Sequence, residues 1–461
     1  MTTPSASLRG AAGARARSAM LGELVRLAWP VVLARLGIMV MGLTDAVVVG
    51  RHSARELGYH ALGWAPTMVV VTTSVGLLMG VQVMTARHIG EGRRDQVGGV
   101  FRRGLVYAVW IGVPSTLLLA LGGPPAMHAI GLERDLAEGS SRTLVVFSLS
   151  LIPYLIACVG QFFLEALGRP KPGMVAMWAA NGVNLAANLW LVPGASGLPV
   201  EGAVASAWAT FIARAFLAVW LMAFILRLPE ARALGVFVKP SDGARAAAEQ
   251  RKVGYGSGAS YFLEVGAFAA MTVIAGWLGG VEAAAWSVVL NVAAVIFMGP
   301  LGLATATSVL VGRAFGARDR HRMVLAGLTG FAVTSLLMVL VCVVVFFGAG
   351  AIAGVYTQDP RLLAIVTPAL LLSCLFFIAD GVQVVGGQAL RARGDVWLPT
   401  GIHLTAYVLV MMPLAWLLAH PLGLGVNGIV WAVIVASLVS ASLFVGRFLL
   451  LARRDARLTS A

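Results

Sequence analysis

Twelve apolar segments follow one another along the chain, and short polar or charged stretches separate them. Most are long enough to cross the roughly 30 Å hydrocarbon core of a bilayer as helices rising about 1.5 Å per residue. The pattern predicts an all-α polytopic membrane protein with twelve transmembrane helices. The segments are 24–50, 58–85, 104–124, 143–164, 173–193, 202–226, 254–276, 284–311, 324–352, 362–387, 398–419 and 425–446.

The chain also repeats itself. GLLMGVQVMTARHIG, from Gly76 to Gly90, returns as GLATATSVLVGRAFG, from Gly302 to Gly316, at an interval of 226 residues. Because each repeat would hold an even number of helices, both repeats enter the membrane from the same side, and their pseudo-twofold axis runs along the membrane normal. We therefore expect two six-helix halves. The expected divisions are a basic tail 1–23, an N-terminal half 24–226, a linker 227–253, a C-terminal half 254–446 and a basic tail 447–461.

The charge distribution predicts the orientation of these helices. A net charge of +14 would suggest nucleic-acid binding in a soluble protein, but here 59% of the residues are hydrophobic and 12% are charged. Of the 34 Lys and Arg, 27 fall on the side that holds both termini, five on the other side, and Arg35 and Arg214 inside predicted spans. The positive-inside rule then places both termini in the cytoplasm. The expected partner is therefore the lipid bilayer and not nucleic acid. The Arg-, Ala- and Val-rich composition is typical of a GC-rich bacterial genome, so we expect the membrane to be the bacterial cytoplasmic membrane.

Two acids inside apolar segments of the C-terminal half are the first candidate site. Glu264 lies about ten residues, and Asp380 about seven, from the cytoplasmic ends of their segments, a difference of roughly 5 Å in depth. An acid in the middle of a membrane helix costs roughly 2.5–3.5 kcal/mol on insertion scales, so such residues usually mark ion or substrate paths. The pair could share a proton or hold a cation. The alternative is two unrelated acids in separate polar pockets that only join helices.

A second candidate site lies in the N-terminal half. Asp45 falls near the outer end of the first segment, and Asn184 and Asn188 in the fifth share one helix face because they are four residues apart. Carboxylate and amide oxygens suit a polar pocket. The alternative is that the asparagines only form hydrogen bonds between helices, which is common in membranes.

The two arginines inside the membrane should face the interior of the N-terminal half, because a guanidinium facing lipid is strongly disfavoured. Arg35 lies roughly 15 Å along its helix from Asp45, too far for direct pairing. The sequence therefore favours Arg214 as the partner of Asp45.

These residues carry a resemblance that covers nearly the whole chain. It resembles the multidrug and toxic compound extrusion (MATE) family, nearest the NorM-like branch. The matching features are Pro30 and Asp45 in the first segment, Asn184 and Asn188 in the fifth, Glu264 in FLEVGAF, Asp380 with the VQVV that follows it, and LRARGD at 390–395. The chain departs from the family pattern at Arg35, Trp286 and Phe376, which leaves the drug spectrum open.

The resemblance implies a secondary active multidrug exporter, not an enzyme, that exchanges H⁺ or Na⁺ for organic, amphipathic cations by alternating access. It implies that Glu264, Asp380 and Asp45 couple the cation, that Asn184 and Asn188 form a polar pocket, and that Glu264 and Asp380 are metal ligands only if the ion is Na⁺. No cofactor is expected, the substrates are drug-like small molecules, and the protein is expected to be a monomer.

Two other classes of function remain open. One is a flippase for lipid-linked precursors from the same broad superfamily, which extra helices and a strongly cationic cavity would favour. The other is a membrane-embedded enzyme or receptor, but the sequence holds no HExxH, no P-loop lysine motif and no recognisable arrangement around a nucleophile.

Overall fold

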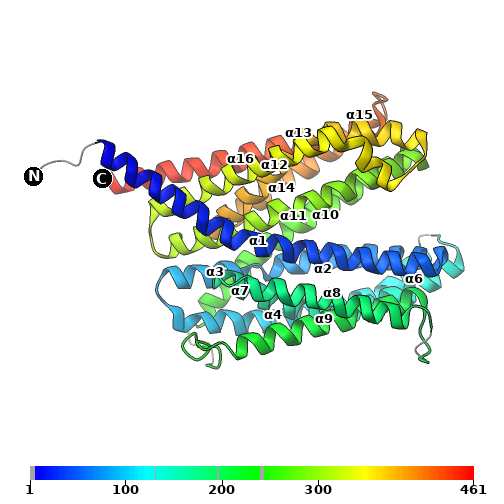
Figure 1. Cartoon of the computed structure of the whole chain (residues 1–461), viewed down its shortest axis with the longest axis horizontal. Helices are drawn as coiled ribbons and strands as arrows, with labels where there is room; N and C mark the ends of the chain where they lie inside the picture. Colours follow the sequence, from blue (N-terminus) through cyan, green and yellow to red (C-terminus); the bar gives the residue numbers. More distant parts are fainter. Residues whose placement is uncertain (1–5, 130, 195–196, 239–242, 461) are drawn as a thin grey trace, which may run out of the picture. The chain divides into compact units, whose positions relative to one another are not determined.

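The computed structural model describes residues 6–129, 131–194, 197–238 and 243–460, with side chains described between 15 and 454. All regular elements in these residues are helical (Figure 1). In chain order they are α1 Ala6–His52, α2 Ala54–Leu78, α3 Gly80–Gly90, η1 Arg94–Gln96, α4 Val97–Leu117, η2 Leu118–Gly122, α5 Gly123–Ala129, α6 Arg134–Leu149, α7 Leu151–Ala166, α8 Lys171–Leu191, α9 Gly202–Leu226, α10 Gly243–Leu278, α11 Gly280–Gly316, α12 Arg320–Tyr356, α13 Pro360–Ala392, α14 Trp397–His403, η3 Leu404–Met411, α15 Met412–Ala419 and α16 Gly425–Ser460.

The prediction of twelve helices is confirmed. Some are broken, so that α2 continues into α3, α4 into η2 and α5, α6 into α7, and α14 into η3 and α15. Within the described residues, eleven of the twelve are long and apolar enough to cross a membrane. The twelfth is α8, whose 21 residues include Asn181, Asn184 and Asn188. Three amides lower its mean hydropathy although its length suffices to span.

Short polar residues fix where several helices begin. Asp319 precedes α12, and its side chain accepts a hydrogen bond from the backbone N–H of Arg322 at 2.9 Å. Asp359 does the same before α13, where Pro360 occupies the first helical position. An N-cap oxygen satisfies one of the free N–H groups of the first turn, and proline needs no partner there.

The repeat seen in the sequence returns in the structure. The two copies end helices at matching residues, since α3 ends at Gly90 and α11 at Gly316. A second matching pair, Gly168 and Gly394, both have positive φ angles, +80° and +100°. Each follows a helix end and lets the chain turn in a conformation that favours glycine. The halves therefore share local geometry as well as sequence.

The chain forms two compact units. The N-terminal unit comprises Leu33–Phe262, and the C-terminal unit comprises the residues up to Val32 together with Leu263–Ala461. The boundaries fall inside α1 and α10, so each of these helices contributes to both units.

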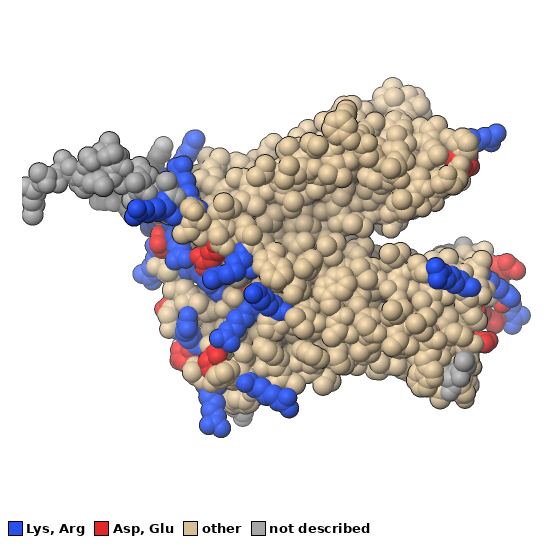
Figure 2. Space-filling model, viewed as in Figure 1, with Lys and Arg blue, Asp and Glu red and all other residues tan. Residues whose placement is uncertain are grey.

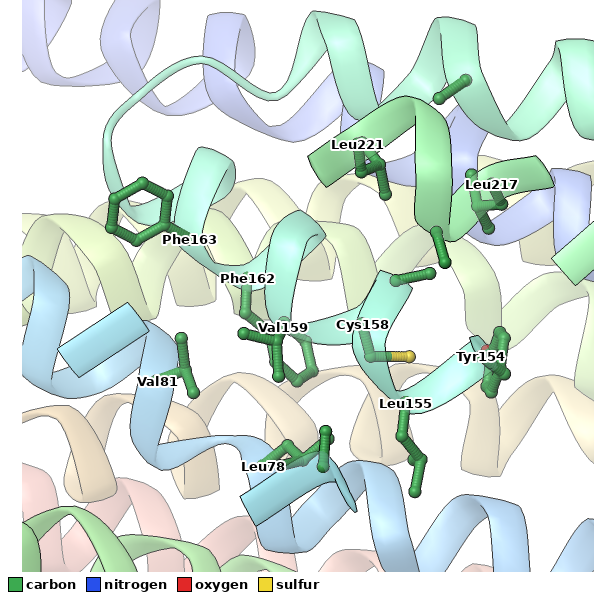
Figure 3. Packing of buried hydrophobic residues seen from close by; sticks show 14 of the residues in the cluster. Leu78, Val81, Tyr154, Leu155, Cys158, Val159, Phe162, Phe163, Leu217 and Leu221 are labelled. Atoms are coloured by element: carbon green, nitrogen blue, oxygen red, sulfur yellow. The ribbon is translucent and has the colours of Figure 1, made fainter. Parts of the chain in front are cut away.

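In the N-terminal unit, α2, α4, α6, α7, α8 and α9 pack around a buried apolar core. Much of that core comes from α7, whose face from Tyr154 to Phe163 meets Leu78 and Val81 on one side and Leu217 and Leu221 on the other (Figure 3). The first part of α10 packs here too: backbone of α10 at Gly254 and Gly258 lies so close to Leu77 that side chains at these glycines would overlap it.

In the C-terminal unit, α11, α12, α13, α15 and α16 pack against one another. Their core includes Trp286, Phe376, Phe377, Tyr407 and Ile429, all nearly inaccessible to solvent. The first part of α1 belongs to this unit, where Gly302 of α11 lies against Val32. Glu23 accepts a hydrogen bond from Arg322 at 2.8 Å and so ties α1 to the start of α12.

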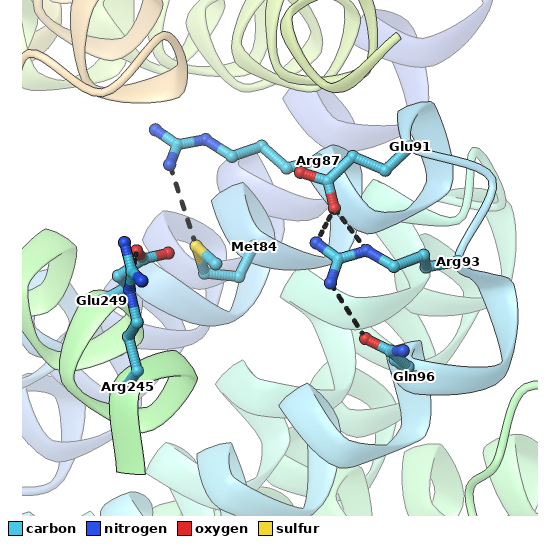
Figure 4. A network of polar contacts seen from close by, with 7 residues as sticks. All are labelled: Met84, Arg87, Glu91, Arg93, Gln96, Arg245 and Glu249. Atoms are coloured by element: carbon cyan, nitrogen blue, oxygen red, sulfur yellow. Dashed lines mark hydrogen bonds and ion pairs between the residues drawn. The ribbon is translucent and has the colours of Figure 1, made fainter. Parts of the chain in front are cut away.

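The surface of each unit is largely apolar along the helices, with Lys and Arg concentrated near the helix ends (Figure 2). At the basic end of the N-terminal unit, Arg93 donates hydrogen bonds to Glu91 and Gln96, and Arg87 approaches Met84 (Figure 4). Large exposed side chains such as Trp110 and Phe347 lie between these ends. An extensive apolar surface of this kind is stable only against lipid.

Candidate functional site

Asp45 lies in a closed polar pocket of the N-terminal unit. Its Oδ1 accepts hydrogen bonds from the Nδ2 atoms of Asn184 at 2.9 Å and Asn188 at 2.8 Å, and its Oδ2 accepts one from the Thr210 hydroxyl at 2.6 Å. The carboxylate is 3% exposed. Helices α1, α8 and α9 meet here, so the expected association of Asp45 with the two asparagines is present.

The spacing of the amides on α8 produces this arrangement. Asn184 and Asn188 project from one face, one turn apart, and Asn188 also donates to the backbone carbonyl of Asn184 at 2.9 Å. Asn181, one turn earlier, donates instead to the carbonyl of Gly37 at 3.0 Å and so joins α8 to α1. Sequence reasoning missed Thr210, because a threonine in an apolar helix is common and carries no signal by itself.

In the C-terminal unit, Asp380 belongs to a chain of polar side chains. Gln383, one turn later on α13, donates to the Asp380 Oδ1 at 2.6 Å and to the Tyr407 hydroxyl oxygen at 2.6 Å. Ser440 of α16 in turn donates to the Gln383 Oε1. All four side chains are buried. The network joins α13, η3 and α16 around one carboxylate.

Glu264 lies next to this network. Its carboxylate lies close enough to Tyr407 and Asp380 to interact electrostatically with both. Glu264 is partly exposed, whereas Asp380 is buried. Tyr407 is in η3, an eight-residue π-helical stretch, and such distortions often occur at functional sites. The two acids expected to cooperate therefore lie in one cluster with Tyr407 and Gln383, neither of which the sequence reading assigned as a partner.

A third buried acid was missed altogether. Glu165, at the end of α7, accepts hydrogen bonds from Arg35 at 3.3 Å through Oε1 and from Gln82 at 2.9 Å through Oε2. The three side chains are 7%, 5% and 0% exposed for Arg35, Glu165 and Gln82. The predicted fourth span stopped at residue 164, one position short, so Glu165 was counted outside the membrane.

Both membrane arginines face the interior of the N-terminal unit, as predicted, and Arg214 interacts electrostatically with Asp45, but the two form no direct ion pair. Arg214 donates to the Ser150 hydroxyl at 2.7 Å and lies over the ring of Tyr154, with its Cζ 4.5 Å from the ring centroid. Asp45 already has three neutral donors, while an aromatic face stabilises the guanidinium of Arg214. The break between α6 and α7 at Ser150 places this hydroxyl within reach.

The other departures from the family pattern are packing positions. Trp286 is 1% exposed and Phe376 is 2% exposed, and both belong to the core of the C-terminal unit. Phe376 stacks edge-on against Phe377, with ring centroids 4.7 Å apart. These side chains support the unit that carries Asp380.

The arrangement can hold small cations or protons at two places. In the N-terminal unit, the Oδ1 atoms of Asn184 and Asn188 accept no hydrogen bond from any described residue and are buried beside the Asp45 carboxylate. In the C-terminal unit, two carboxylates lie in one cluster with the Tyr407 hydroxyl and the Gln383 amide. Carboxylate, amide and hydroxyl oxygens are the ligands that hard cations take, and no described residue here forms a nucleophile arrangement.

Two repeats of membrane-length helices with acids buried inside them define a class of protein, the polytopic membrane transporters. The MatE family model matches residues 30–190 and 257–417. The chain belongs to this family, the MATE transporters, which are not enzymes.

Relatives support this assignment over nearly the full length. The chain is 57% identical over 433 residues to the "Probable multidrug resistance protein NorM" of Caulobacter vibrioides, covering 94% of this chain and 92% of that one. It is 30% identical over 453 residues to the protein of the same name from Bradyrhizobium diazoefficiens, with 94% of each chain covered.

Solved structures share the fold. A eukaryotic MATE transporter superposes with a TM-score of 0.87 at 18% identity, covering 96% of this chain and 98% of that one. An outward-facing multidrug resistance MATE family transporter gives a TM-score of 0.86 at 18% identity, covering 96% and 97%. At these identities the likeness concerns the fold alone.

Proposed function

We propose that the chain is a secondary active exporter that exchanges H⁺ or Na⁺ for organic, amphipathic cations by alternating access. Membership of the MATE family supports transport, and the names of the relatives support multidrug compounds as the substrates. No described part of the chain suggests an energy source other than an ion gradient.

One observation carries the proposal: Glu264 and Asp380 interact electrostatically inside an apolar unit, beside the Gln383 amide that donates to Asp380 and to the Tyr407 hydroxyl oxygen. In the proposed cycle, a cation or proton binds to this pair, and its occupancy competes with substrate. Exchange requires that ion and substrate favour different conformations, because a ligand shifts an equilibrium only by its difference in affinity between the states.

The Asp45 pocket, with Asn184 and Asn188, serves in this proposal as a second cation-coupling site. If the ion is Na⁺, Glu264 and Asp380 are its ligands in the C-terminal half, with hydroxyl and carbonyl oxygens completing the shell. No cofactor takes part. The bilayer and drug-like small molecules are the partners, and the transporter acts as a monomer.

The orientation is part of the proposal. Both termini and the linker 227–253 lie in the bacterial cytoplasm, with the six-helix halves 24–226 and 254–446 on either side of that linker in sequence. The Lys and Arg near one set of helix ends support this orientation.

The test is efflux of a fluorescent organic cation from proteoliposomes that hold the full chain, under separately imposed H⁺ and Na⁺ gradients. We expect one gradient to drive efflux, and the double variant Glu264→Gln/Asp380→Asn to insert normally and lose it. Efflux by the double variant equal to that of the unmodified chain would reject the proposed cation site. Movement of a labelled lipid-linked precursor with no cation efflux would favour the flippase instead.

A further inference from the structure

A groove on the surface of the N-terminal unit combines an apolar wall with two arginines. It has a volume of about 530 Å³, and its wall is formed mainly by α9. Phe216, Val219, Trp220 and Phe224 line it along the helix. Arg169, from the turn after α7, and Arg227, directly after α9, lie at one end.

The length of the groove matches one leaflet of a bilayer. From Phe216 to Arg227 the chain advances eleven residues, about 16 Å along a helix, and half of a typical hydrocarbon core is about 15 Å. Phe216 and Trp220 lie side by side, with ring centroids 5.5 Å apart. The groove therefore offers an acyl chain an apolar surface as deep as the leaflet, with arginines at the depth of its headgroups.

The two arginines differ in what they already bind. Arg169 forms an ion pair with Glu230 at 2.8 Å. The side chain of Arg227 is exposed and makes no hydrogen bond or ion pair with any described residue. A guanidinium in this state has all its donors available, and guanidinium groups bind phosphate oxygens in a bidentate manner.

A second apolar groove shows that the arginines are not a general feature of such surfaces. It lies between α11 and α12 in the C-terminal unit, has a volume of about 400 Å³, and no charged residue lines it. Its wall includes Val295, Val344 and Tyr356. An apolar groove in the membrane accommodates any lipid chain, but of these two grooves the one on α9 adds a positive charge for a headgroup.

We propose that the groove of α9 binds a phospholipid with an anionic headgroup, whose phosphate contacts Arg227 and Arg169 and whose acyl chain lies along Phe216, Val219 and Trp220. A basic residue beside a membrane helix attracts anionic lipid, whereas an apolar wall alone does not distinguish headgroups. The site is separate from the Asp45 pocket, and binding there does not require that transport occur.

The test uses the purified full chain in detergent and native mass spectrometry with added phosphatidylglycerol. We expect Arg227→Gln to weaken phosphatidylglycerol binding about fivefold, the effect of removing one basic residue near a membrane surface. Arg232→Gln is the matched control: it removes the same charge from an exposed residue of the same turn that does not line the groove. It should leave binding unchanged.

Three further arms complete the test. Phosphatidylcholine, whose choline cation cancels the charge of its phosphate, should bind more weakly than phosphatidylglycerol and lose less binding on Arg227→Gln. Glycerol phosphate alone should not bind, since it lacks the chain. Ala223→Trp should fill the groove and reduce phosphatidylglycerol binding with no change of charge.

Equal losses in Arg227→Gln and Arg232→Gln would overturn the proposal, because they would indicate a diffuse charge effect. Unchanged phosphatidylglycerol binding in both Arg227→Gln and Ala223→Trp would also overturn it, as would binding of glycerol phosphate alone. A doubled mass that Ala223→Trp abolishes would show that a second copy of the chain occupies the groove, and would overturn the proposal too.

Discussion

The Asp45 pocket and the Glu264–Asp380 network solve the same physical problem in different ways. Asp45 receives three neutral donors, which occupy both of its oxygens. In the C-terminal unit two acids interact electrostatically, Gln383 donates a hydrogen bond to Asp380, and Glu264 is partly exposed. The first arrangement holds a single acid in a fixed geometry. The second can redistribute protons or take up a cation with little rearrangement of its neighbours.

The charges around the two sites also differ. The N-terminal unit balances two buried acids, Asp45 and Glu165, with two buried arginines, Arg35 and Arg214. At the C-terminal network, Glu264 interacts electrostatically with Asp380 and with Arg391. This difference suggests that ion uptake is more readily coupled to conformation in the C-terminal unit.

The largest effect should come from removing one acid at each site. We expect Asp380→Asn to reduce gradient-driven efflux to the background of empty vesicles, because the remaining acid cannot share a proton or cation with a partner. Asp45→Asn should lower efflux and leave it measurable. Efflux assays in proteoliposomes with equal amounts of inserted protein check this comparison. The reverse order, with Asp45→Asn inactive and Asp380→Asn active, would transfer coupling to the N-terminal half.

The next effect concerns the charge balance of the N-terminal unit. Glu165→Gln leaves Arg35 buried with no counter-charge and should destabilise the protein by about 3–5 kcal/mol. The double variant Arg35→Met/Glu165→Leu should recover most of that loss. The measurement is unfolding in mixed detergent micelles. As a control, Arg134→Ala removes an exposed pair with Glu138 and should cost about 0.5 kcal/mol or less. A similar small cost for Glu165→Gln would contradict the interpretation.

A smaller effect distinguishes the packing of the two repeats. A Cβ at Gly80 would overlap the backbone oxygen of Gln250, while the matching position in the second repeat is Ala306. Gly80→Ala should destabilise the protein by about 1–3 kcal/mol, as overpacked cores do. Gly182→Ala on α8, where nothing lies within 4 Å, should instead stabilise by about 0.4–1 kcal/mol. Thermal unfolding in detergent measures whether each substitution raises or lowers stability. Stabilisation by Gly80→Ala as well as by Gly182→Ala would contradict the close contact between Gly80 and Gln250.

A comparison of two buried hydroxyls, in which the measured quantity is a small difference, probes the charge on Asp45. Thr210→Val removes a donor to a carboxylate, and Ser440→Ala removes a donor to the amide oxygen of Gln383. A hydrogen bond to a charged group contributes about 1.5–3 kcal/mol and a neutral one about 0.5–1.5 kcal/mol, so Thr210→Val should cost about twice as much. Equal losses in micelle unfolding would indicate that Asp45 carries a proton.

The sequence by itself determined the number of helices, the repeat and the general place of Asp45, Glu264 and Asp380. These features depend on local properties, namely the length of apolar runs, the interval between copies and the position of a charge within a run. The pairing of Asn184 and Asn188 with Asp45 followed from helical periodicity on α8, once a carboxylate in a neighbouring apolar helix was recognised.

Tertiary structure decided which side chains meet. Glu165 lay one residue beyond a predicted boundary, and only the packing of α7 against α1 and α3 revealed it as the partner of Arg35. Arg214 contacts Ser150 and Tyr154 directly and interacts with Asp45 only electrostatically, because a long side chain reaches several neighbours and the helix orientations select among them. Thr210 and Tyr407 became site residues for the same reason. A hydroxyl gains its role from the group it faces, and which group that is depends on contacts between helices far apart in the sequence.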